Sequence, residues 1–82
     1  MMENLDRIKK DISELILTHR KKSGMSQSEL AKLAGVGKTV IFDLEHGKTT
    51  VQLDTLLRVL KALNIEMKFS SPLLQAMKEK QE

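Results

Sequence analysis

The chain of 82 residues carries 14 Lys and Arg against 11 Asp and Glu, a net charge of +3 that permits a polyanionic partner without requiring one. Its 40% hydrophobic and 30% charged residues are typical of one small globular domain rather than of a disordered chain. The chain contains no Cys for a disulfide or a thiolate metal site, and no apolar run approaches the roughly 20 residues of a membrane helix.

The first predicted element is an amphipathic helix that starts at Leu5. Its apolar residues recur at steps of three and four, with charged residues between them: Leu5, Ile8, Ile12, Leu15 and Ile16. The basic run over residues 19–22 suits the negative end of a helix dipole, and Gly24 can take the left-handed cap conformation. We therefore expect the helix to end near residues 23–24.

Residues 27–44 contain the most informative pattern of the sequence. One short helical pattern precedes Gly35 and a second one follows it. Ser26 and Glu29 have the spacing of a capping box, which predicts that the second helix begins there. The third helix is predicted over about residues 38–46. Two short helices joined by about four residues with a glycine form a helix-turn-helix.

A fourth helix with a wide apolar face is predicted over residues 53–63. The period then changes to an alternation that predicts a half-exposed strand, with Ile65, Met67 and Phe69 on one side. A single strand has no partner within this chain, so we expect two copies to pair antiparallel in a homodimer. The alternative is an irregular packing segment.

The domain organisation follows from these elements. Residues 1–70 are predicted to form one domain, which contains the helix-turn-helix and the strand expected to mediate dimerisation. Pro72 ends the strand, and residues 71–82 form a short tail whose alternatives are one or two helical turns or a mobile terminus.

The apolar and small residues of the central stretch occupy fixed places counted from Gln27: Leu30, Ala31, Ala34, Gly35, Val36, Ile41 and Leu44. This pattern resembles the helix-turn-helix of the Cro and repressor (XRE) family, and the resemblance spans about residues 15–63. It implies an all-α, lambda-repressor-like bundle of four main helices, followed here by the one C-terminal β-strand. It also implies sequence-specific DNA binding rather than an enzyme activity.

The resemblance assigns base contacts to the start of the third helix. Lys38 can donate to guanine O6 and N7, and Thr39 can bond a base or offer its methyl group to thymine. Val40 offers only an apolar contact. Asp43 can accept from cytosine N4 or orient Lys38, and its alternative is a solvated helix residue.

Contacts to the DNA backbone are expected from helix ends and basic flanks, where amides and cations meet phosphate. The predicted residues are Gln27, Ser28, Gly37, Lys21, Lys22, Lys48 and Thr49; for the lysines, solvated surface charge is the alternative. The resemblance also pairs Arg20 with Glu45 in a partly buried salt bridge. Phe42 departs from the family, which usually has a polar residue there; the alternatives are packing on the first helix or on a sugar.

The order of four helices, one strand and a tail is similar to that of HipB-type antitoxins. That resemblance implies a homodimer that binds a palindromic operator, represses its own operon and restrains a HipA-like serine/threonine kinase toxin. A free-standing regulator and a toxin-binding module with little DNA binding remain the alternatives. We expect no cofactor and no metal, because His19 and His46 lack further ligands at a metal spacing. The N-terminus has no signal pattern, so we expect a cytoplasmic, nucleoid-associated protein without membrane contact.

Overall fold

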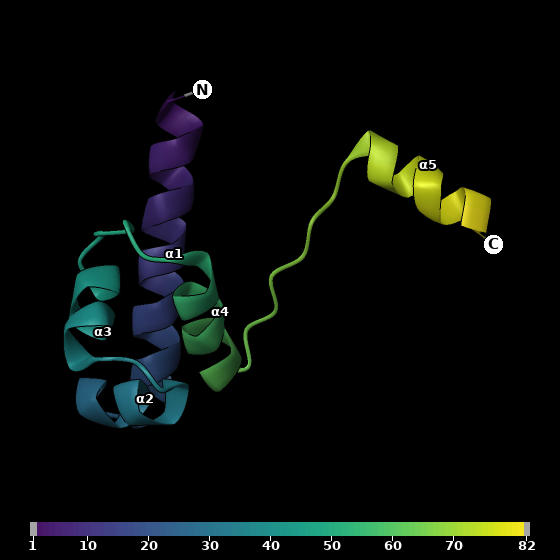
Figure 1. Cartoon of the computed structure of the whole chain (residues 1–82). Helices are drawn as coiled ribbons and strands as arrows, with labels where there is room; N and C mark the ends of the chain where they lie inside the picture. The colour runs from purple at the N-terminus through teal and green to yellow at the C-terminus, as the bar shows by residue number, and fades with distance from the viewer. Residues whose placement is uncertain (1, 82) are drawn as a thin grey trace.

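The computed structural model describes residues 2–81, and its side chains are described over residues 4–78. Its elements are α1 (Met2–Lys22), α2 (Gln27–Ala34), α3 (Lys38–Glu45), α4 (Leu53–Ala62) and α5 (Pro72–Gln81). The helices α2, α3 and α4 pack around the lower part of α1, while α5 stands apart at the end of an extended segment (Figure 1). The predicted all-α class and helix-turn-helix are confirmed.

The ends of α1 and α2 follow local sequence signals. Beyond α1, Gly24 takes a left-handed φ of +73°, and its amide donates to the carbonyl of Lys21. Ser26 caps α2: its hydroxyl accepts from the Glu29 amide at 3.0 Å, and the Glu29 carboxylate accepts from the Ser26 amide at 2.9 Å. The predicted capping box is therefore confirmed. These bonds hold the pKa of Glu29 below its usual value, with the bond from the Ser26 amide as the largest cause.

A single apolar core lies between α1, α2, α3 and α4. Its fully buried members are Ile16, Leu30, Ile41, Leu44 and Val59. α2 packs against both α3 and α4, and α3 packs against α1. Gly35 lies in the turn between α2 and α3 with φ +72°, and its left-handed conformation lets the chain reverse so that both helices share this core.

The predicted strand over residues 65–69 is wrong for this chain, since residues 64–71 form no strand in the structure. Asn64 takes a left-handed φ of +58°, and the Ile65 amide donates to the Leu60 carbonyl at 2.9 Å. Ile65 thereby closes the end of α4 and packs on the core. Met67 and Phe69 follow in an extended segment, and none of residues 2–81 forms a strand that could pair with it in a ladder.

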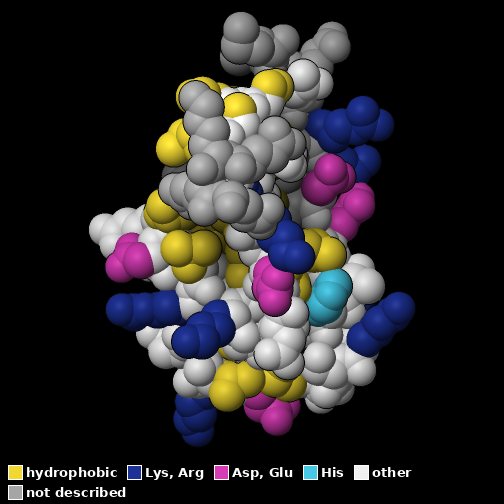
Figure 2. Space-filling view, turned by 90° about the vertical axis from the view of Figure 1, so that its right-hand side faces the viewer, with side chains coloured by type: hydrophobic (Ala, Val, Ile, Leu, Met, Phe, Trp, Pro, Cys, Tyr) yellow, Lys and Arg dark blue, Asp and Glu magenta, His cyan; other side chains and the backbone are white. Residues whose placement is uncertain are grey.

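The segment 72–81, predicted as a short tail, forms the ten-residue helix α5. Ser71 caps it, its hydroxyl accepting from the Leu74 amide at 2.9 Å. Apolar side chains remain exposed along the segment and on α5: Met67, Phe69, Leu73 and Met77. Seen from the α5 side, hydrophobic side chains reach the surface among charged ones (Figure 2). Among the described residues, no helix is both long and apolar enough to cross a membrane.

Candidate nucleic-acid interface

The start of α3 presents its first side chains to solvent. Lys38 and Thr39 are exposed, and together with Gln27 and Phe42 they line a shallow depression between the beginnings of α2 and α3. Gly37 precedes α3 in an extended conformation and provides no side-chain cap. The amides of Lys38 and Thr39 therefore have no side-chain cap, whereas the Val40 amide donates to the Gly37 carbonyl at 3.1 Å. The uncapped amides lie next to a lysine and a threonine side chain that can donate to base edges.

Two other residues that were predicted to contact bases, Val40 and Asp43, already contact other residues of the protein. Val40 is half-buried and packs against the core, which leaves little of its side chain for a base. Asp43 is also half-buried, and its carboxylate lies 3.8 Å from the Lys48 ammonium. The structure thus pairs Asp43 with Lys48 rather than with Lys38.

The predicted backbone contacts lie at the ends of α1, α2 and α3. Lys21 and Lys22 are exposed in the last turn of α1, and Ser28 is exposed in the first turn of α2. Lys48 is exposed and Thr49 half-buried in the loop after α3.

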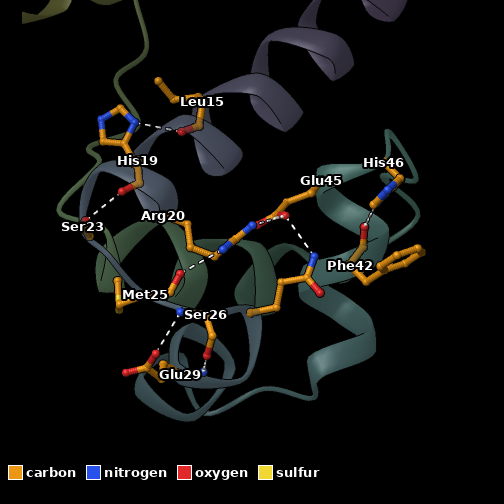
Figure 3. Close-up of polar contacts among 11 residues, drawn as sticks. Leu15, His19, Arg20, Ser23, Met25, Ser26, Glu29, Phe42, Glu45 and His46 are labelled. Carbon is orange, nitrogen blue, oxygen red and sulfur yellow. Dashed lines mark hydrogen bonds and ion pairs between the residues drawn. The ribbon is translucent and has the colours of Figure 1, made fainter.

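Arg20 and Glu45 form the ion pair that holds α1 to α3. Arg20 Nε donates to Glu45 Oε2 at 2.5 Å, and Nη2 donates to Oε1 at 3.0 Å. The two side chains are only 12% and 2% exposed. Arg20 Nη1 also donates to the Met25 carbonyl at 2.9 Å, so the guanidinium fixes the loop between α1 and α2 as well (Figure 3).

Sequence reasoning missed a third member of this network. Gln27 Nε2 donates to Glu45 Oε1 at 3.1 Å, so a residue expected to contact phosphate is held in place by the buried carboxylate. Nothing in the sequence reveals this bond, because 18 positions separate the two residues and only the packing of α2 on α3 brings them together.

The charge state of Glu45 follows from these contacts. Burial alone would raise the pKa of its carboxyl. Hydrogen bonds from Arg20 and Gln27, with the positive charge of Arg20, outweigh burial and leave the pKa below the ordinary value of 4.5. The bond to Glu45 likewise raises the pKa of Arg20. Both partners are therefore charged at neutral pH.

Phe42 does not pack on α1. The residue is 49% exposed, and its ring stacks on that of His46 with centroids 4.0 Å apart and planes inclined by 23°. The Phe42 carbonyl can only accept, so His46 Nδ1 donates to it, at 2.7 Å. Figure 3 shows both side chains on the part of α3 turned away from Arg20. The spacing of four residues was the available sequence signal for this pair.

Comparison with known proteins places this geometry in a family. A helix-turn-helix family profile matches residues 16–69, well over half of the chain. The chain belongs to the helix-turn-helix family. This is a family of DNA-binding transcription regulators rather than of enzymes.

Several curated proteins resemble the chain over this region. An uncharacterized HTH-type transcriptional regulator, y4mF, of Sinorhizobium fredii is 42% identical over 62 residues, which cover 76% of the chain and 82% of that protein. Control protein C.SmaI of Serratia marcescens is 35% identical and the ImmF control region 10 kDa protein of Bacillus phage phi105 is 31% identical. Those matches cover 70% and 71% of the chain, and 68% and 64% of the respective relatives.

Proposed function

We propose that the chain is a sequence-specific transcriptional repressor that inserts α3 into the major groove of DNA. The observation that carries this proposal is the exposed group of Lys38 and Thr39 at the uncapped start of α3. A buried ion pair fixes the helix that bears them to the rest of the bundle, and a fixed helix is what reading of base edges requires. The names of two relatives, a control protein and a phage control-region protein, agree with a regulatory role.

In this arrangement α2 lies across the DNA backbone. Gln27, Ser28 and Gly37 are proposed to contact phosphate through amides and polar side chains at helix ends. Lys21, Lys22, Lys48 and Thr49 add further phosphate contacts, and Asp43 reads a base only when DNA draws Lys48 away from it. Because its proposed partner is double-stranded DNA, we propose that it acts on the DNA of the cytoplasmic nucleoid.

Selection of DNA from a random duplex library by the full chain tests this function, followed by gel shifts with the selected duplex. Lys38→Ala should weaken binding by about 1–3 kcal/mol and relax the preference at one guanine. The matched control is Lys61→Ala, which removes the same charge from the last turn of α4. Equal losses for the two variants, or a selection that enriches no sequence, would contradict the proposal.

We also propose that the repressor acts as a homodimer on a palindromic operator. The support is the exposed apolar surface of the segment after α4 and of α5, where Phe69 is 76% and Leu73 is 72% exposed. A chain this small gains burial by sharing such a surface with a second copy. Sedimentation of wild type beside Phe69→Ser/Leu73→Ser tests the idea: the wild type should dimerise and the variant should not. A wild type that stays monomeric at the highest concentrations would rule out this dimer.

A second candidate is the antitoxin role, in which the dimer also restrains a HipA-like serine/threonine kinase toxin. The same exposed apolar segment favours it, because an exposed apolar patch typically serves as a contact surface. Purification of the tagged chain from its native cell separates the candidates. A stoichiometric kinase would support the antitoxin, and recovery of the chain alone would support the free-standing regulator.

A further inference from the structure

Phe42 lies in the middle of the surface of α3 that is proposed to read DNA. Successive residues of an α-helix are rotated by about 100° around its axis. Measured from Lys38, Phe42 therefore lies at about 40°, Thr39 at about 100° and Asp43 at about 140°. All four belong to the same helix. A duplex that touches Lys38 and Thr39 must also meet the side chain between them.

The surroundings of the ring agree with this placement. Phe42 shares the shallow depression between α2 and α3 with Gln27, Lys38 and Thr39. Its ring is half-exposed rather than folded into the core, so DNA in the depression would remove apolar surface from water. The side chain thus stands among the donors proposed for phosphate and guanine, but it carries no polar atom of its own.

The ring is also held in one orientation. His46 lies one turn further along, stacks on the Phe42 ring at 4.0 Å and donates from Nδ1 to the Phe42 carbonyl. This bond ties the imidazole to the backbone of α3, and the stack then restricts the ring (Figure 3). An aromatic side chain that is restricted before binding loses less conformational entropy when DNA arrives.

In the major groove, the apolar group that distinguishes one base from the others is the 5-methyl group of thymine. Phe is one of the side chains that contact this methyl group. We propose that Phe42 is a specificity-determining residue that contacts a thymine methyl, and that His46 is a positioning residue that holds its ring. The inference rests on the proposed insertion of α3 into the major groove.

The test replaces each thymine of the selected duplex in turn with deoxyuridine, which removes only the methyl group. For the wild type, one replacement at the Phe42 contact should weaken binding roughly fourfold, the value of one buried methyl group. Phe42→Ala should bind thymine and deoxyuridine equally at that position, while its response at every other thymine stays that of the wild type. The matched control is Leu53→Ala, which removes an exposed apolar side chain at the start of α4 and should keep the full methyl dependence.

The role of His46 is tested on the same duplexes. His46→Ala should reduce the methyl dependence below the wild-type value without lowering the melting temperature, because His46 is exposed. His46→Tyr keeps a stacking ring and should restore most of that dependence. A loss that the tyrosine does not restore would overturn the positioning role.

The outcomes separate the inference from the proposed function. If Phe42→Ala and the wild type show the same methyl dependence at every thymine, or if the selected duplex has no thymine, the methyl contact is overturned while sequence-specific binding stands. If the library yields no preferred sequence, the proposed function fails and the methyl contact fails with it.

Discussion

Removal of the Glu45 carboxylate should destabilise the fold itself. Glu45→Ala leaves the Arg20 guanidinium 12% exposed, without its carboxylate and with only the Met25 carbonyl as an acceptor. Breaking one partner of a buried pair typically costs about 3–5 kcal/mol. Because Arg20 keeps one acceptor, we expect the lower end, about 3 kcal/mol. A domain of 82 residues has roughly 4–12 kcal/mol of stability, so this loss is a large fraction of the total.

Thermal unfolding followed by circular dichroism measures this effect. For a domain of this size, about 3 kcal/mol corresponds to a fall in melting temperature of roughly 12–24 °C. The matched control is Glu66→Ala, since Glu66 pairs with Lys68 across 3.5 Å with both side chains more than three quarters exposed. That exposed pair should contribute less than about 1 kcal/mol.

A double variant separates the effect of an unpaired buried charge from the effect of a changed side-chain shape. Arg20→Met/Glu45→Met removes both charges together and should be more stable than Glu45→Ala, because no buried charge is then left unpaired. Unchanged melting of Glu45→Ala, together with lost DNA affinity, would refute the reasoning. Glu45 would then act at the DNA and not between α1 and α3.

Three further predictions concern pH, the turn and the DNA backbone. The pKa of Glu45 is lowered on folding, so its stabilising effect is full above the ordinary value of 4.5 and is lost as the pH falls through the folded value. The melting temperature should therefore drop below about pH 4.5, and less steeply for Glu45→Gln. Gly35→Ala should cost about 1–2 kcal/mol in urea unfolding through backbone strain at φ +72°. A steric clash does not contribute, since beyond the adjacent residues no atom lies within 4 Å of the added Cβ; a neutral result would show that the turn relaxes. Lys48→Ala should weaken DNA binding equally on all sequences and reduce the slope of log affinity against log salt by about one, and an unchanged slope would exclude the phosphate contact.

Patterns within one helix or one turn predicted much of the bundle. The spacing of Ser26 and Glu29 located the start of α2, and Gly35 located the turn, because both signals act through hydrogen bonds and φ values within a few residues. The apolar periodicity of α1 indicated only part of its packing. Ile16 is buried and Ile12 packs on the core, whereas Leu5, Ile8 and Leu15 are exposed.

The segment after α4 shows where such patterns fail. Alternation of Ile65, Met67 and Phe69 is compatible with a strand, but a strand exists only where a neighbour supplies its hydrogen bonds. The amide of Ile65 is instead engaged by the end of α4, and Phe69 lies in extended chain without a ladder. A two-residue period shows which side chains are apolar, but it does not show that a neighbouring strand is present to form the hydrogen bonds.

The sequence by itself determined that a helix-turn-helix forms, since capping, turn and periodicity are local properties of residues 26–44. Only the tertiary structure decided which residues outside the helix-turn-helix contact it. It joined Gln27 to the buried Arg20 and Glu45 pair and left Phe42 exposed beside the start of α2. The contacts of Gln27 and Arg20 with Glu45 span 18 and 25 positions. Such contacts depend on how helices pack against one another, which no local pattern encodes.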